Sequence, residues 1–169
     1  ATAMQPEATI DDVIANVLRY PGAAGAQAGE FVGRMNRLLE IAASCEDVFD
    51  LREPFYRELL VTFPPWEAVF ALEMVPCALA LSLIARGDPA QAIIGAANLG
   101  RDADTIAGMA GGLTGALAGA KALPAEWVDK VVRANPEPDL PQLAADLCEV
   151  LIEQAQERQR SAAAILSLT

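Results

Sequence analysis

The chain has 169 residues, of which 53% are hydrophobic and only 5% aromatic, and its formal net charge is −11 at pH 7. This length is sufficient for one domain with a substantial core, and the dominance of small residues favours closely packed helices over a β-sandwich. The acidic balance excludes binding to the phosphate backbone of a nucleic acid, because no basic face is available to displace counterions.

The first part of the chain shows helical spacing and clear helix starts. Thr9 and Asp12 have the spacing of a capping box, which predicts a helix after Thr9. A second helix is predicted over residues 24–44, with a surface ion pair between Glu30 and Arg34. Short helices broken near Pro54 are predicted over residues 45–62, followed by a helix that begins near Pro65. The most apolar stretch, residues 68–85, is interrupted by Glu73 and Pro76 and is predicted to be a buried helix instead of a membrane span.

The second part of the chain is rich in glycine. Asp88 and Pro89 predict the cap and first residue of a short helix that ends near Ala97. The next predicted helix, residues 105–121, carries four regularly spaced glycines, which are Gly108, Gly112, Gly115 and Gly119. Each glycine lowers the stability of an isolated helix by about 1 kcal/mol relative to alanine. Close packing against other helices would explain these glycines, so we expect other helices to cross there at close range. Helices are also predicted over residues 124–133 and from Leu140, with residues 153–169 as a frayed tail or a partner contact. The predicted fold is all-α, a compact bundle of seven or eight helices in a single domain over residues 1–169.

Several residue types limit the chemistry. The sequence contains no histidine, which removes Ser-His and Cys-His catalysis and any histidine-based zinc site. The cysteines are widely spaced and are expected to be small buried groups in a reducing compartment: Cys45, Cys77 and Cys148. No signal peptide is recognised at the start, so a cytoplasmic location without membrane association is expected.

A short polar loop between two small-residue helices carries the candidate chemistry. Asp102, Asp104 and Thr105 place two carboxylates and a hydroxyl within four positions, which is oxygen ligand chemistry suited to a hard cation such as Mg²⁺. The same residues are also preferred at the N-terminus of a helix, where they cap backbone N–H groups and complement the dipole. On the residues alone, both interpretations stay open.

The neighbourhood of this loop resembles a known family. The order Asn98-Leu99-Gly100-Arg101-Asp102-Ala103-Asp104-Thr105, the Gly/Ala-rich helix after it and the following Leu123-Pro124-Ala125-Glu126-Trp127 resemble the C-terminal signature of the ADP-ribosylglycohydrolase family, which includes the enzyme that removes ADP-ribose from dinitrogenase reductase. The segment from Glu73 to Leu79 is similar to the family's segment that precedes the two helices on either side of this loop. The resemblance extends over residues 9–151.

The resemblance implies a function and a set of roles. It implies Mg²⁺-dependent hydrolysis of a ribosyl glycosidic bond, with ADP-ribose or an ADP-ribosylated substrate as ligand. Asp102, Asp104 and Thr105 would be ligands of a pair of Mg²⁺ ions, and Asn98, Gly100 and Arg101 would bind substrate, with Gly100 allowing a close approach of the backbone. Arg101 stands where the family usually has glycine; it either pairs with a structural acid or reaches a substrate phosphate.

Part of the family's pattern is not found. The Gly-Asp-Ala and Thr-Asp-Asp-Thr regions that supply further ligands, and the acidic residue that handles protons, have no match here, so the catalytic residue is unassigned. Two aspartates and a threonine cannot complete two octahedral Mg²⁺ shells without more carboxylates or much water. We therefore expect the chain to be the C-terminal portion of the fold, to need a missing N-terminal half or partner chain, and to be nearly inactive alone. The alternative is a non-catalytic helical interaction module derived from the family.

Overall fold

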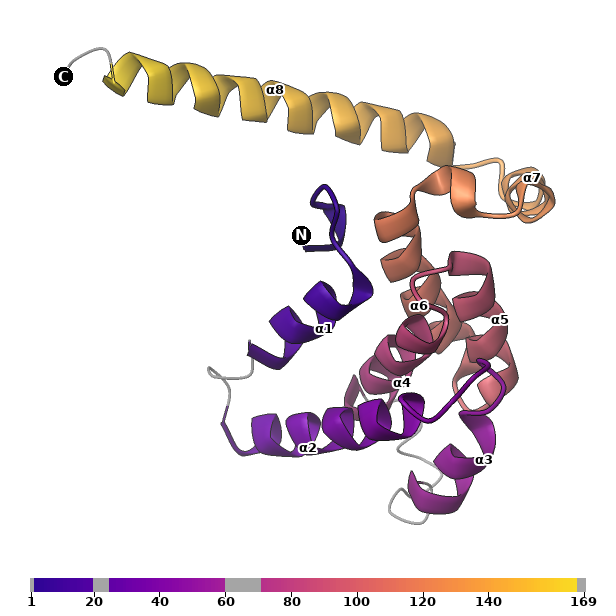
Figure 1. The fold of residues 1–169 in the computed structure, drawn as a ribbon. Helices are drawn as coiled ribbons and strands as arrows, with labels where there is room; N and C mark the ends of the chain where they lie inside the picture. Colours follow the sequence, from indigo (N-terminus) through magenta and orange to yellow (C-terminus); the bar gives the residue numbers. More distant parts are fainter. Residues whose placement is uncertain (1, 20–24, 60–70, 167–169) are drawn as a thin grey trace. The chain divides into compact units, whose positions relative to one another are not determined.

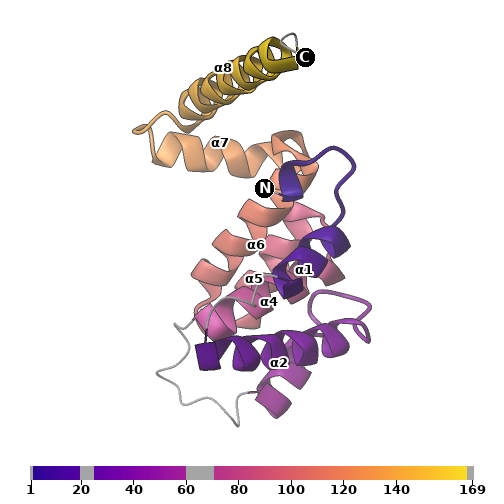
Figure 2. The ribbon, with the colours of Figure 1, turned by 90° about the vertical axis from the view of Figure 1, so that its left-hand side faces the viewer.

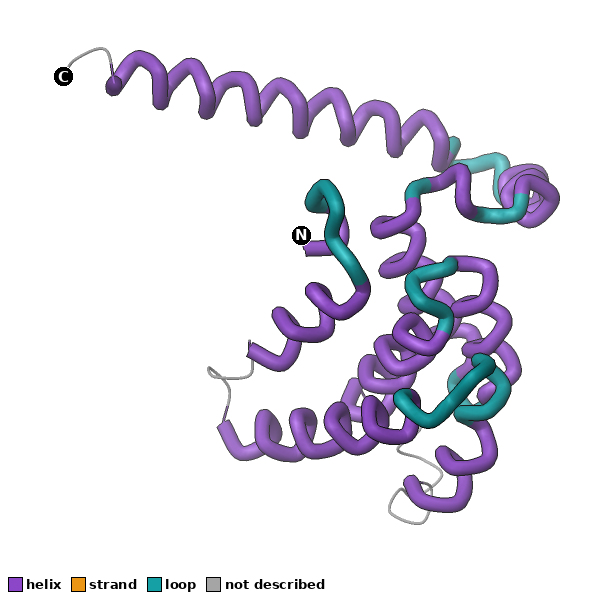
Figure 3. The backbone as a smooth tube through the Cα atoms, viewed as in Figure 1, coloured by secondary structure: helices purple, strands orange, loops and turns teal. Residues whose placement is uncertain are grey.

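The computed structural model describes residues 2–19, 25–59 and 71–166, and over these residues the chain is all-α, as predicted, with eight α-helices and no strand (Figure 3). Its contacts divide it into two compact units, residues 1–124 and 125–169. The single domain over residues 1–169 stays a prediction, since a compact set of contacts is not by itself a folding unit.

The first unit contains six helices (Figure 1). They are α1 (Ile10–Arg19), α2 (Gly25–Ala42), α3 (Arg52–Pro54), α4 (Ala71–Ile84), α5 (Pro89–Leu99) and α6 (Ala103–Ala118). A π-helical turn, η3 (Phe55–Leu59), continues α3, and two short 3-10 turns, η1 (Thr2–Met4) and η6 (Ala120–Ala122), precede α1 and follow α6. The predicted start of the helix at residues 65–70 lies outside the described residues.

Helix α1 begins at the predicted capping box. The backbone N–H of Asp12 donates to Thr9 Oγ1 at 3.2 Å, and the N–H of Thr9 donates to Asp12 Oδ2 at 2.9 Å. These bonds satisfy donors that the first helical turn leaves without partners. The ion pair predicted on α2 between Glu30 and Arg34 is also present.

Helix α4 is the element around which the first unit packs. It contacts α1, α2, α5 and α6, and Figures 1 and 2 show these helices around it from two sides. Its buried residues lie on every face of the helix, which agrees with the continuous apolar run in the sequence. Glu73 is the one charged residue of α4, and it is 2% exposed. A buried carboxylate requires a partner, and Arg101 of the polar loop supplies it.

Helices α5 and α6 lie side by side and are joined by the polar loop. Asp88 caps α5 as predicted, since its Oδ1 accepts from the N–H of Gln91 at 2.8 Å. Two glycines allow close packing here: a Cβ at Gly95 would lie 2.6 Å from Val48 Cβ, and one at Gly111 would lie 2.9 Å from the side chain of Ile93.

Within the described part of the chain, no helix makes the close crossing predicted at the four spaced glycines of α6. A Cβ at Gly108, Gly112, Gly115 or Gly119 would meet no described atom within 4 Å. The helix turns a different side, that of Gly111, toward α5. Gly119 has another role, because it ends α6 with a φ of +81° that glycine adopts without steric cost.

The second unit contains two helices, α7 (Ala125–Ala134) and α8 (Leu140–Leu166). Asp139 begins α8 by accepting from the N–H of Gln142 at 3.0 Å. The predicted frayed tail from residue 153 is wrong, because α8 continues to Leu166. This stretch consists mostly of alanine, glutamate, glutamine and arginine, which are strong helix formers, and it contains no glycine or proline. Among the described helices, none is long and apolar enough to cross a membrane.

The second unit also changes the expectation for one cysteine. Cys77 on α4 is buried and Cys45 is half-buried, but Cys148 on α8 is exposed. Neither α7 nor α8 buries a side chain, so the apolar residues of α8 do not surround Cys148 with a core.

Candidate functional site

The polar loop makes a sharp reversal between α5 and α6. Gly100 has a φ of +91° and Arg101 a φ of +60°, so two successive residues take left-handed conformations. Gly100 also lies against Tyr56, because a Cβ there would lie 2.4 Å from the hydroxyl of that side chain. The close approach at Gly100 is therefore to Tyr56, while its predicted approach to a substrate stays a prediction.

Arg101 is held in this conformation by Glu73. Its Nε donates to Glu73 Oε1 and its Nη2 to Glu73 Oε2, both at 2.7 Å, in a bidentate pair that joins the loop to α4. The side chains are 9% and 2% exposed. The hydrogen bonds to Glu73 raise the pKa of Arg101, so the guanidinium stays charged. Of the two interpretations of Arg101, the structure shows the pair with an acid; contact with a substrate phosphate stays a prediction.

The two aspartates lie at the start of α6 and close to each other. Asp102 occupies the cap position, but its side chain accepts no capping hydrogen bond. A hydrogen bond with Asp102 lowers the pKa of the Asp104 carboxyl, and the backbone N–H groups of Thr105 and Asp104 lower it further. Asp104 is exposed, whereas Asp102 and Thr105 are half-buried. The capping interpretation thus holds in part for Asp104 and not for Asp102.

Asp102, Asp104 and Thr105 offer the type of ligand that a hard divalent cation prefers, but fewer ligands than such a cation needs. Two neighbouring carboxylates and one hydroxyl are suitable oxygen ligands for Mg²⁺, which takes six. Within the described part of the chain, no group of three or more Asp, Glu, Cys or His side chains could hold a metal ion. Asp102, Asp104 and Thr105 can therefore supply at most part of such a site.

Asn98 lies at the end of α5 and is used within the fold. Its side-chain amide donates to the backbone carbonyl of Ile94 at 2.9 Å. The backbone carbonyl of Asn98 accepts from Arg52 Nη1 at 3.0 Å. Its predicted contact with substrate stays a prediction. Arg52 is one of three residues next to the loop that the sequence analysis did not connect to it, together with Tyr56 and Glu73. Of these three residues, only Glu73 could have been noticed in the sequence, because it is a charged residue within a helix predicted to be buried.

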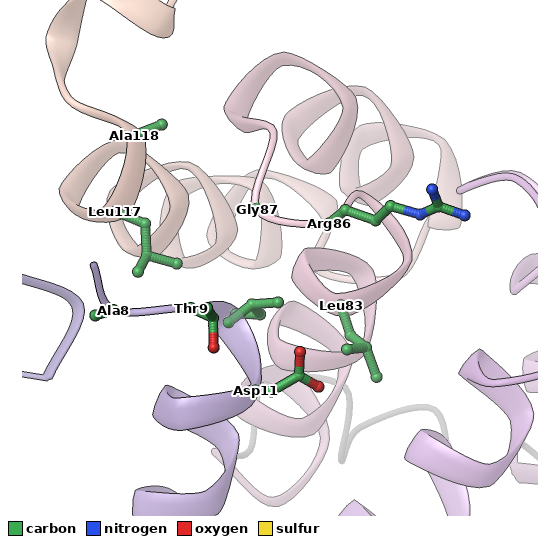
Figure 4. Close-up of a pocket in the computed structure, with 9 residues that line it drawn as sticks. Ala8, Thr9, Asp11, Leu83, Arg86, Gly87, Leu117 and Ala118 are labelled. Atoms are coloured by element: carbon green, nitrogen blue, oxygen red, sulfur yellow. The ribbon is translucent and has the colours of Figure 1, made fainter.

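A separate cavity lies at the other end of α6. Figure 4 shows this pocket of about 520 Å³ between the start of α1, the end of α4 and the end of α6, with Thr9, Arg86 and Leu117 among its lining residues. Leu117 is about 20 Å along the helix from the aspartates, at 1.5 Å per residue. The pocket is therefore not part of the loop site.

Comparison with known proteins identifies the relatives of this loop and of the helices around it. The sequence matches the ADP-ribosylglycohydrolase family over residues 1–160. This chain belongs to the ADP-ribosylglycohydrolase family. The resemblance seen in the loop is thus confirmed, and the all-α fold of the chain agrees with the family.

Two curated proteins match shorter stretches of this family member. The uncharacterized protein YegU of Escherichia coli (strain K12) is 48% identical over 52 residues, which cover 31% of this chain and 16% of that protein. ADP-ribosylarginine hydrolase Tri1 of Pseudomonas putida (strain GB-1) is 58% identical over 40 residues, which cover 24% of this chain and 11% of that protein. The matched segments thus span only a small part of these relatives. No solved structure matches the chain.

Proposed function

We propose that the protein takes part in the Mg²⁺-dependent hydrolysis of a ribosyl glycosidic bond in an ADP-ribosylated substrate, and that this chain supplies part of a site for two Mg²⁺ ions. Membership of the ADP-ribosylglycohydrolase family supports the hydrolysis of an ADP-ribose linkage. The observation that carries the metal site is the pair of neighbouring carboxylates of Asp102 and Asp104, the first of which makes no capping bond.

The surroundings of the two carboxylates also support a cation. The nearest arginine in sequence, Arg101, is engaged by Glu73. Two carboxylates in contact repel each other when both are ionised, and a bound divalent cation relieves that repulsion.

The chain's own residues have distinct tasks in this proposal. Asp102, Asp104 and Thr105 would hold the metal, and the pair of Arg101 with Glu73 would fix the loop against α4 so that these ligands keep their positions. When bound, Mg²⁺ would orient the ribose hydroxyls and polarise the reacting water. The remaining ligands and the acid/base residue would come from an N-terminal half or a partner chain. The open face of α6 at Gly108 and Gly112 is suitable for close packing against such a partner.

The metal site is tested by Mg²⁺ titration calorimetry. We expect saturable binding by the chain and its loss in the double variant Asp102→Ala, Asp104→Ala, with a weaker effect of Thr105→Ala. The matched control is Glu153→Ala, Glu157→Ala, which removes two exposed carboxylates from one face of α8 and should bind as the parent does. Equal Mg²⁺ affinity of the Asp102→Ala, Asp104→Ala variant and the control variant would contradict the proposed metal site.

The activity is tested on the protein with its remaining ligands restored. One relative is named an ADP-ribosylarginine hydrolase, so ADP-ribosylarginine is the first substrate to test. We expect Mg²⁺-dependent release of ADP-ribose that is lost in the Asp102→Ala, Asp104→Ala variant. A restored protein that releases no ADP-ribose from any ADP-ribosylated substrate would contradict the proposal.

A second candidate function is a non-catalytic helical interaction module. It is favoured by the small number of ligands in the described part of the chain and by the open glycine face of α6. This candidate predicts no saturable Mg²⁺ binding by the chain, so the same titration separates the two functions.

A further inference from the structure

A groove lies directly beside the polar loop, on the side of α3 and η3. It has a volume of about 580 Å³, and the residues that line it are Phe49, Arg52, Glu53, Tyr56 and Arg57. A smaller cavity of about 90 Å³ shares Phe49 and Arg52 with it and also contacts Asn98 at the start of the loop. The groove is therefore next to the start of the loop.

Phe49 presents an aromatic ring to this groove at an energetic cost. Its side chain is 51% exposed, and it is the one aromatic residue among the strongly exposed apolar side chains of the described chain. The loop that carries it is held in place, since the N–H of Phe49 donates to Asp47 Oδ1 and those of Glu46 and Asp47 donate to Asp50 Oδ2, all at 2.9 Å. An exposed ring on a backbone held in this way is a stacking surface for a planar ligand.

Arg52 brings a positive charge to the same place. Its guanidinium lies 5.5 Å from the centroid of the Tyr56 ring, and its Nη1 donates to the carbonyl of Asn98. Over the described residues, no carboxylate forms an ion pair with Arg52, whereas Arg57 in the same groove is paired with Glu53 and Glu58. On a chain of net charge −11, an arginine without an acidic partner beside a candidate site is available to an anion.

Tyr56 connects the groove to the turn of the loop. Its hydroxyl lies 2.4 Å from the position that a Cβ of Gly100 would take, and Gly100 precedes Asp102 by two residues. A ligand seated on Phe49 and Arg52 would therefore reach the loop across Tyr56 without crossing another helix.

We propose that Phe49, Arg52 and Tyr56 form a subsite for a nucleoside diphosphate, the ADP part of the substrate. This inference rests on the proposed function. The base stacks on the ring of Phe49, the diphosphate pairs with the guanidinium of Arg52, and the ribose at the other end of the diphosphate extends past Tyr56 toward Asp102 and Asp104. Glu53, which also lines the groove, is neutralised by Arg57 and does not oppose the phosphate.

The test is ADP binding to the chain in EDTA, measured by calorimetry, so that the metal site takes no part. Stacking of a base is worth about 1–3 kcal/mol and 1.4 kcal/mol is a factor of ten. We therefore expect Phe49→Ala to weaken ADP binding about tenfold, and Arg52→Gln to weaken it by a similar factor. Phe49→Tyr and Arg52→Lys should each recover part of the affinity. Arg86→Gln, at an exposed arginine outside the groove, is the matched control and should bind ADP as the parent does.

Two simpler ligands separate the parts of the subsite. The affinity for inorganic pyrophosphate should fall in Arg52→Gln but not in Phe49→Ala. The affinity for adenosine should fall in Phe49→Ala but not in Arg52→Gln. Circular dichroism of each variant checks that the fold is kept. Absence of ADP binding at millimolar concentration, or equal ADP affinity in parent, Phe49→Ala and Arg52→Gln, would overturn the subsite. Because Mg²⁺ binding is measured separately, a failure of the metal site is distinguished from a failure of this proposal.

Discussion

At the scale of single residues, the pair of Arg101 with Glu73 determines how the candidate ligands are presented. A non-glycine residue at a φ of +60° is unfavourable by itself. Two charge-assisted hydrogen bonds to a buried carboxylate compensate for that cost. The family usually has glycine at this position, which adopts the same conformation freely. The loop shape is therefore obtained in this chain by a long-range ion pair.

Breaking the pair from one side should be costly. Glu73→Gln leaves the Arg101 guanidinium without its counter-charge in a nearly buried position, and we expect a loss of about 3 kcal/mol of unfolding free energy, measured in urea. The double variant Glu73→Leu, Arg101→Gly removes both charges and gives residue 101 the conformational freedom of glycine. It should be less destabilised than Glu73→Gln. Equal destabilisation of both variants would show that the ion pair is not the cause.

The cysteines should differ sharply in reactivity. Burial raises the pKa of Cys77, the carboxylate of Glu73 raises it further, and only Arg101 opposes this shift. At neutral pH the Cys77 thiol therefore stays protonated and does not react. With iodoacetamide, mass spectrometry should find the exposed Cys148 modified first, and Cys77 modified only after unfolding. Modification of Cys77 at the rate of Cys148 in the folded chain would contradict the buried position.

At the scale of elements, the glycines of α5 and α6 have opposite roles although their sequence context is similar. Gly95 lies where α5 meets Val48 and Leu81, with no room for a methyl group. Gly108 lies on the open face of α6. Helical spacing alone does not distinguish these cases, because both are small residues within small-residue helices.

This difference can be measured with the same substitution at both positions. Gly95→Ala should destabilise the fold by about 1–3 kcal/mol, because the methyl group overlaps Val48. Gly108→Ala should stabilise it by up to about 1 kcal/mol, because alanine is the better helix former and meets no neighbour. Thermal and urea unfolding of the two variants check the signs. Destabilisation by Gly108→Ala would show that another part of the protein covers this face.

At the scale of the whole molecule, the net charge of −11 affects how the proposals are tested. A strongly acidic chain attracts cations everywhere on its surface, so the loss of Mg²⁺ binding must be compared with a control that removes two other carboxylates. The same charge repels an anionic ADP-ribose. Any subsite for this ligand therefore needs a local cation without an acidic partner, and Arg52 is such a residue within the described chain.

The sequence alone determined the features that depend on neighbours three or four residues apart. The capping box of Thr9 and Asp12, the cap at Asp88 and the all-α class follow from local hydrogen bonds and helical spacing, and the loop from Asn98 to Thr105 identified the family. The tertiary structure decided what depends on residues distant in sequence. Arg101 contacts Glu73 across 28 positions and Arg52 contacts Asn98 across 46. Such contacts depend on the path of the chain, and no local pattern specifies which buried acid an arginine meets or which side of a glycine-rich helix is covered.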